Sequence, residues 1–152
     1  MANFKITTLL TGVALMLSVA ACGPSLVIQN VDYSQPIESV ITPAEDHTIH
    51  DQRYAISFSV APLLTEENIS SVNEVHLIRN HKGYYFVTAA GFSNIYVLKA
   101  AEGELALQTI IQLTGNGLGQ PALNQRGDYI EVVDLSTGQT YQVNEEGIRG
   151  EA

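Results

Sequence analysis

Cysteine is almost absent from this chain of 152 residues, which contains Cys22 and no other. Tryptophan is missing, and seven Lys and Arg residues stand against sixteen Asp and Glu residues, for a formal net charge of −9. A single cysteine excludes an internal disulfide and a zinc site of several thiolates, so burial and hydrogen bonds must hold the fold. The negative charge repels phosphate groups, so we expect no nucleic acid partner and no direct binding to anionic lipid head groups.

Long apolar runs are lacking too, except at the N-terminus. Lys5 gives a short positive start, the segment from Ile6 to Leu17 carries no charge, and the small residues Val19, Ala20 and Ala21 follow. This layout is typical of a secretory signal peptide. The run is shorter than the ~20 residues that a membrane-spanning helix needs. An uncleaved membrane helix and an ordinary signal peptide remain the alternatives to the interpretation given next.

The segment Val19-Ala20-Ala21-Cys22 resembles the lipobox of bacterial lipoproteins. The resemblance implies that residues 1–21 are a lipoprotein signal peptide, that the thiol of Cys22 carries a diacylglycerol, and that its amine carries a further acyl chain such as palmitate. Two or more acyl chains hold a protein stably at a membrane. Members of this family that stay in the inner membrane tend to have aspartate after the cysteine, whereas this chain has Gly23. We therefore expect a lipid anchor on the periplasmic face of the outer membrane.

The rest of the chain is long enough for one domain with a hydrophobic core. Pro36 and Pro43 interrupt the apolar pattern, so we interpret residues 22–52 as a lipid-anchored N-terminal segment and linker. Residues 53–145 are predicted to form a single β domain, and residues 146–152 a frayed tail.

A period of two dominates the sequence from Tyr54 onward and predicts strands with one buried face. Short turns separate these strands, which favours an antiparallel meander. We therefore predict an all-β fold of about seven to nine short strands, arranged as a sandwich or as a barrel-like meander. The segments Tyr84–Val87 and Ile95–Leu98 are apolar on both faces, which is typical of central strands covered on both sides.

Three local predictions complete this description. Thr65–Ile69 is expected to form one helical turn capped by Thr65, after Pro62 has ended a strand. Within Glu104–Leu113, strict alternation would place Leu105, Leu107, Thr109, Ile111 and Leu113 on one face. The glycine-rich segment Thr114–Pro121 is expected to be a mobile loop, because the strand pattern after it does not fit a phosphate-binding loop.

A weak internal repeat aligns Ile95–Leu98 with Ile130–Val133. The stretch Pro121–Gly138 also resembles a blade segment of β-propeller proteins, which are usually interaction scaffolds. Partial propeller-like sheets are therefore an alternative fold. A similarity of one hairpin to another explains the same pattern and is the interpretation that we favour.

Few side chains in the sequence suggest chemistry. His47 and His50, near Asp46 and Asp51, are candidate metal ligands if their segment forms a helical turn, but in an extended segment their rings point apart. No Gly-x-Ser-x-Gly motif and no cofactor motif is present. We therefore expect no enzyme, no catalytic residue and no cofactor.

These features together suggest a non-enzymatic accessory module that binds another protein of the cell envelope, through a sheet edge or a loop. Two alternatives remain open. One is a periplasmic binder of a metal or a small molecule, and the other is an inhibitor or exclusion factor whose acidic surface meets a basic target at the cell surface.

Overall fold

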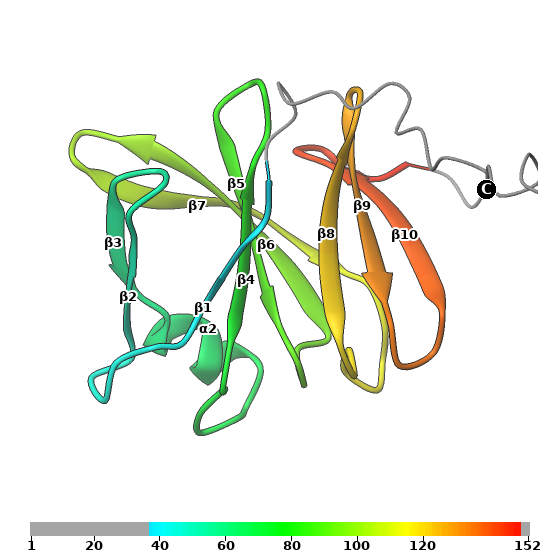
Figure 1. Ribbon diagram of the computed structural model, residues 1–152, viewed down its shortest axis with the longest axis horizontal. Coiled ribbons are helices and arrows are strands. Elements are labelled where there is room, and N and C mark those ends of the chain that lie inside the picture. Colours follow the sequence, from blue (N-terminus) through cyan, green and yellow to red (C-terminus); the bar gives the residue numbers. More distant parts are fainter. Residues whose placement is uncertain (1–36, 150–152) are drawn as a thin grey trace, which may run out of the picture. The chain divides into compact units, whose positions relative to one another are not determined.

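The computed structural model describes residues 37–149, and the predicted signal peptide and Cys22 lie outside this range. The described residues form eleven strands and one short helix in three antiparallel sheets, none of which closes into a barrel (Figure 1). The prediction of a mostly β, antiparallel fold is confirmed. The elements are β1 (Ser39–Ile41), β2 (Thr48–Asp51), β3 (Ile56–Ser59), α2 (Ala61–Glu66), β4 (Val75–Arg79), β5 (Tyr84–Ala89), β6 (Asn94–Ala101), β7 (Glu104–Gln112), β8 (Pro121–Arg126), β9 (Tyr129–Asp134), β10 (Gln139–Asn144) and β11 (Gly147–Ile148).

A five-stranded sheet with the order β1-β4-β5-β6-β7 forms the middle layer of the domain. The side chains of β5 and β6 alternate between two separate cores, because successive residues of a strand point to opposite faces. Tyr85 and Val87 enter one core, and Phe86 enters the other. All three are buried, so the prediction that these strands are covered on both sides is confirmed.

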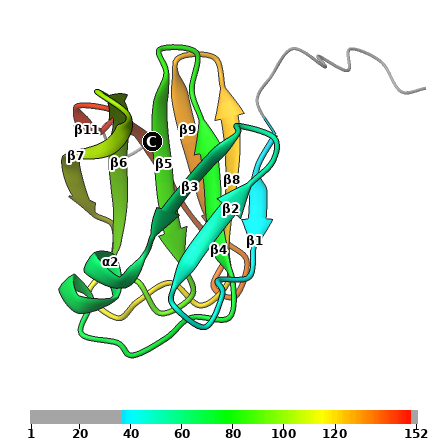
Figure 2. The same ribbon diagram turned by 90° about the vertical axis from the view of Figure 1, so that its left-hand side faces the viewer.

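The first core lies between this sheet and a cover formed by the β2–β3 hairpin and α2, which lie over the sheet in Figure 2. Ile56 and Phe58 of β3 point into it, as the predicted alternation requires. In α2, Leu63 and Leu64 supply the buried contacts. This core therefore joins the cover to strands β4, β5 and β6 of the five-stranded sheet.

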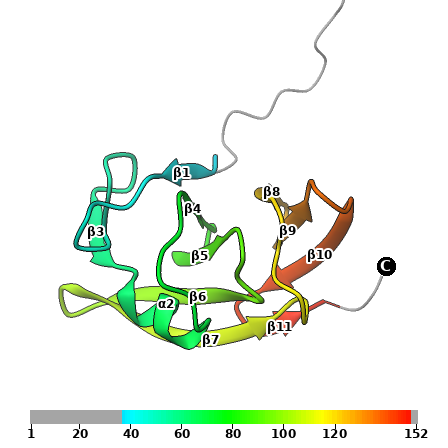
Figure 3. The same cartoon turned by 90° about the horizontal axis from the view of Figure 1, so that it is seen from below.

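The second core lies between the opposite face of the five-stranded sheet and a four-stranded sheet of order β11-β10-β9-β8. Ile130, Val132 and Val143 contribute from the four-stranded sheet, and each is fully buried. Figure 3 shows β8 and β9 beside β4 and β5, with β11 next to β7. The two sheets thus bury their facing sides against each other.

A β-bulge in β7 changes the predicted pattern of that strand. Leu107 pairs with Leu98 and Thr109 pairs with Val97, so Gln108 is an extra residue between them. Leu105 therefore packs against the first core, whereas Ile111 belongs to the second core. The prediction that the apolar residues of this strand share one face is wrong, because a bulge moves all later side chains to the other face.

Three boundary predictions are also corrected. Part of the predicted linker forms β1 and β2, and part of the predicted tail forms β11. The helix begins before the predicted helical turn, with Val60 as its N-cap and Pro62 in its first turn. Proline has no backbone N–H, and in the first turn that group would have no acceptor within the helix. The loop before β8, which was expected to be mobile, is anchored at Leu118, which is 2% exposed and whose backbone exchanges hydrogen bonds with Gly91 and Phe92.

The two segments of the internal repeat occupy different positions in their sheets. Ile95–Leu98 lies in β6, between β5 and β7, and Ile130–Val133 lies in β9, between β8 and β10. The alignment thus superimposes the hairpin β6–β7 on the hairpin β9–β10. No helix within residues 37–149 is long and apolar enough to cross a membrane.

Candidate interaction site on strand β7

The outer edge of β7 is the longest sheet edge of the described residues. β7 has nine residues and pairs with β6 on one side only. The opposite edge strand, β1, has three residues, and Arg53 and Tyr54 donate hydrogen bonds to the carbonyl of Ile37 just before it. β11 has only two residues. The other edge of the four-stranded sheet, β8, has six residues, so β7 is the longest edge strand in the part of the chain that the structure describes. An extended segment of another protein can pair with it wherever its outer side is uncovered.

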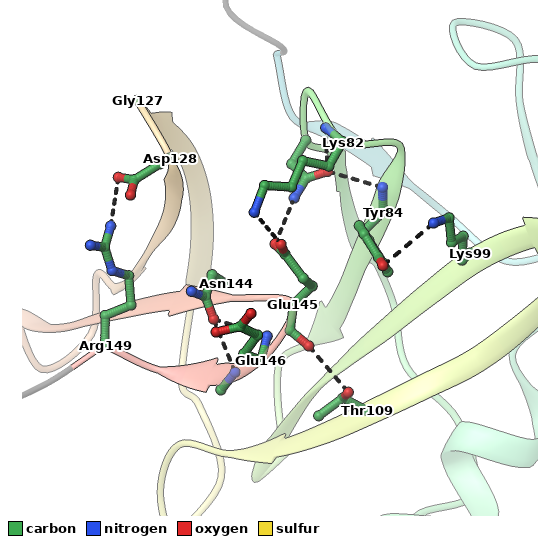
Figure 4. Close-up of polar contacts among 12 residues, drawn as sticks. Lys82, Tyr84, Lys99, Thr109, Gly127, Asp128, Asn144, Glu145, Glu146 and Arg149 are labelled. Carbon is green, nitrogen blue, oxygen red and sulfur yellow. Dashed lines mark hydrogen bonds and ion pairs between the residues drawn. The ribbon is translucent and has the colours of Figure 1, made fainter.

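The second half of β7 is partly covered. Thr109 Oγ1 donates a hydrogen bond of 3.2 Å to the backbone carbonyl of Glu145, in the turn between β10 and β11 (Figure 4). Lys82 forms an ion pair with the Glu145 carboxylate, and Asn80 donates to the same group. The hydrogen bond to Glu145 raises the pKa of Lys82 above its ordinary value. This network fixes the β10–β11 turn beside Thr109 and leaves Glu104–Gln108 as the open part of the edge. Within it, the side-chain amide of Gln108 donates long hydrogen bonds, of 3.4 and 3.5 Å, to the carbonyls of Ala106 and Leu107, and a partner strand would compete with them.

Two large apolar side chains of β7 are exposed on either side of the bulge. Leu107 is 49% exposed and Ile110 is 42% exposed. Leu107 pairs with Leu98 and Ile110 pairs with Tyr96, and both of these partners belong to the first core. The two side chains therefore extend the apolar surface of the first core to the edge of the sheet, where water still reaches them.

The charge around this edge is acidic. Glu102 and Glu104, at the β6–β7 turn, form no ion pair with residues 37–149. Each of the six basic side chains in that range already has a contact. Lys82, Arg126 and Arg149 pair with carboxylates, Lys99 and Arg79 lie over tyrosine rings, and Arg53 donates to backbone carbonyls. A basic partner would thus meet carboxylates that have no cation of their own.

A small cavity lies elsewhere, between the start of β4 and the start of β8. Its volume is about 260 Å³, and its polar wall comprises Ser71, Asn73, Glu74, His76 and Gln120. His76 is 9% exposed, and its Nδ1 lies 2.8 Å from Glu38 Oε1. The same oxygen accepts a hydrogen bond of 2.9 Å from the backbone N–H of Leu123 in β8. Glu38 therefore connects the two larger sheets.

The loop that leads into β8 is held by Asp134. This carboxylate accepts hydrogen bonds from the backbone N–H groups of Gly119 and Gln120, at 3.1 and 2.9 Å. It also accepts from the hydroxyl and the backbone N–H of Ser136. The Ser136 hydroxyl, with these backbone donors, holds the pKa of Asp134 well below its ordinary value. A carboxylate with four donors fixes this wall of the cavity in one geometry.

The predicted metal ligands do not come together as a site. His47 occupies a turn with a φ of 62°, and His50 lies on the exposed side of β2. Within the described part of the chain no group of three or more His, Cys, Asp or Glu side chains is placed to hold a metal ion. The lipidation site Cys22 lies outside this part and stays a prediction.

Neither the open edge of β7 nor the cavity leaves a signal in the sequence. Glu38 falls in the predicted linker and is 38 residues from His76, so no local pattern connects them. The open edge depends on the bulge at Gln108 and on the order of the strands in the sheet, which periodicity does not reveal. Comparisons with known proteins found no family model, no curated protein and no solved structure that match the chain.

Proposed function

We propose that this chain is a lipid-anchored lipoprotein of the bacterial cell envelope, with acylated Cys22 as its anchor, and that its β domain binds another envelope protein. The binding mode is strand addition at the open part of β7. The observation that carries the proposal is the open edge of Glu104–Gln108 beside the exposed Leu107 and Ile110.

An unpaired edge offers backbone donors and acceptors to an extended peptide, and neighbouring side chains select which peptide fits. Proteins usually protect such edges with bulges or charges. The bulge at Gln108 and the acids Glu102 and Glu104 act in this way against indiscriminate pairing. The open segment is short, so a partner needs both backbone pairing and contact with Leu107 to bind.

The charge favours a particular class of partner. Glu102 and Glu104 are exposed and have no cation, so a strand that combines apolar residues with Lys or Arg is complementary. Its apolar residues would cover Leu107 and Ile110. If this chain were an inhibitor or exclusion factor, its target would have the same properties. The identity of the captured protein therefore distinguishes an accessory module from an inhibitor.

The test is site-specific photo-cross-linking in intact cells. A photoreactive residue is placed at position 107 or 110, and the matched control is Leu135, which is 57% exposed in the turn after β9. We expect one discrete adduct from positions 107 and 110 and none from 135. Leu107→Lys should remove the adduct formed from position 110. Equal adducts from all three positions, or no adduct at all, would contradict strand addition at β7.

The anchor is tested separately. Labelled palmitate should be incorporated into the native chain and not into Cys22→Ser, and the native chain should fractionate with the outer membrane. Absence of label in the native chain would contradict the lipoprotein assignment while leaving the β7 edge untouched.

A further inference from the structure

We propose that the cavity between β4 and β8 binds a small organic cation that carries a primary ammonium group. His76 and Glu74 are the groups that take the ammonium. This site is separate from the β7 edge, and the inference depends neither on that edge nor on the lipid anchor.

The Nε2 atom of the His76 imidazole is available as a hydrogen-bond acceptor. A carboxylate only accepts hydrogen bonds, so the contact between Nδ1 and Glu38 places the ring proton on Nδ1. The other nitrogen, Nε2, then carries a lone pair when the ring is neutral. No side chain or backbone group in residues 37–149 donates to Nε2, and this atom is not sealed from solvent. A ligand in the cavity can therefore donate to it.

The charge of the cavity determines the class of ligand. Glu74 is part of the wall, Glu38 lies directly behind His76, and no Lys or Arg side chain lines the space. An anion would be repelled by both carboxylates. A primary ammonium carries three donors, which match the Glu74 carboxylate, His76 Nε2 and a side-chain amide oxygen of Asn73 or Gln120.

The remaining wall favours an organic cation over a metal ion. Val72, Ala90 and Pro121 are apolar and suit a methylene group rather than a hydrated ion. The part of the chain described here offers no grouping of three metal ligands. The volume of about 260 Å³ is below the range of ~300–1,000 Å³ that is usual for drug-sized ligands, so the ligand has few atoms.

Two parts of the cavity wall, the His76 ring and the backbone at Gly119 and Gln120, are held in place by hydrogen bonds. Glu38 is fixed by the N–H of Leu123, and it orients the His76 ring. Asp134 fixes the backbone at Gly119 and Gln120. Such support reduces the entropy that binding would otherwise cost. Ser71 also lines the cavity, but no hydrogen bond within residues 37–149 joins its hydroxyl to His76, so the proposal is one of binding and not of nucleophilic catalysis.

The test is an NMR titration of the full chain, with the histidine ring resonances as the readout and ethanolamine as the probe. Ethylene glycol is the neutral control of similar size. Ethanolamine should shift the His76 ring signals saturably, and ethylene glycol should not. Glu74→Gln keeps the shape and removes the charge, so it should weaken ethanolamine binding about tenfold, which corresponds to about 1.4 kcal/mol.

Glu66→Gln is the matched variant, because it removes an exposed carboxylate at the end of α2 that does not line the cavity. It should leave ethanolamine binding unchanged. The proposal is overturned if ethylene glycol produces the same shifts, if no saturable shift occurs, or if Glu66→Gln weakens binding as much as Glu74→Gln. Since both variants alter surface carboxylates, neither requires a change in the core.

Discussion

Glu67 links α2 to the middle sheet through one buried hydroxyl, and this link can be measured. Tyr96 is fully buried, and its hydroxyl donates a hydrogen bond of 2.8 Å to Glu67 Oε1. The same carboxylate accepts from the backbone N–H of Ser93 and from both the backbone and side-chain N–H of Asn94. Four donors thus meet at one residue just after the end of α2.

The two partners should differ in what their removal costs. Tyr96→Phe deletes one hydrogen bond to a charged group while Glu67 keeps three donors, so we expect the free energy of unfolding to fall by about 1.5 kcal/mol. Glu67→Ala leaves the Tyr96 hydroxyl buried without a partner and also frees the donors of Ser93 and Asn94, and should cost about 3 kcal/mol. The double variant should cost no more than Glu67→Ala alone, because the hydroxyl that Glu67→Ala leaves without a partner is removed as well.

Urea unfolding followed by far-UV circular dichroism measures all three variants, since the chain has no tryptophan for fluorescence. Glu66→Ala is the control, because Glu66 is exposed on the same helix and should change stability by less than about 0.5 kcal/mol. If the costs of Tyr96→Phe and Glu67→Ala simply add, or if Glu67→Ala costs no more than Glu66→Ala, the carboxylate does not serve as the link.

The same pair predicts a dependence on alkaline pH. Burial, followed by the hydrogen bond to Glu67, raises the pKa of Tyr96 above its ordinary value of 10.0. The folded state therefore keeps the phenol proton at a pH at which the unfolded chain has lost it. This contribution to stability is present below pH 10 and declines as the pH rises above 10. Tyr96→Phe should lose less stability over that range than the native chain, and an identical loss in both would contradict the assignment.

Three further predictions concern the second core and the bulge. Asp134→Asn should lower the free energy of unfolding by about 2 kcal/mol at pH 7. Because the pKa of Asp134 in the folded chain lies below the ordinary value of 3.8, that contribution is lost as the pH falls below 3.8. The urea midpoints of the native chain and the variant should therefore converge at low pH, and a constant difference between them would refute this. Gly117→Ala should lower the free energy of unfolding, measured with urea, by at least about 1 kcal/mol more than Gly127→Ala. Both residues have a positive φ, but only at Gly117 would a Cβ lie 2.6 Å from the carbonyl oxygen of Gly91, and equal losses would contradict that close approach. Deletion of Gln108 should expose Ile111 and Leu113, which costs about 1.5–3 kcal/mol for each side chain, and should lower the melting temperature sharply. Gln108→Ala should not have this effect, and a deletion variant as stable as the native chain would mean that the bulge is not required.

Much of the fold follows from periodicity, because burial of strands on one or both faces leaves a direct pattern in the sequence. Phe86 between Tyr85 and Val87 reveals a strand covered on both sides. β1 does not leave such a pattern, since three residues are too few to show alternation. Its position depends on pairing with β4, which is a tertiary interaction.

The candidate sites were harder to predict for a similar reason. The cavity requires Glu38, His76 and Gln120 to meet, and their separation along the chain exceeds any local pattern. Leu118 illustrates the opposite error. Its glycine-rich surroundings suggest mobility, whereas one buried leucine and two backbone hydrogen bonds to Gly91 and Phe92 fix the segment against the second core.

The position of Glu38 also has a mechanical consequence. This residue precedes β1, the first strand described, and its carboxylate reaches both His76 in β4 and Leu123 in β8. Tension applied through the residues before 37 would act first on the hydrogen bonds that Arg53 and Tyr54 donate to Ile37, and next on Glu38 and the three residue pairs that join β1 to β4. Pulling at this end would therefore release His76 before it disturbed either core. A load on the N-terminal segment would then lower the occupancy of the cavity, and a bound ligand would in turn resist the load.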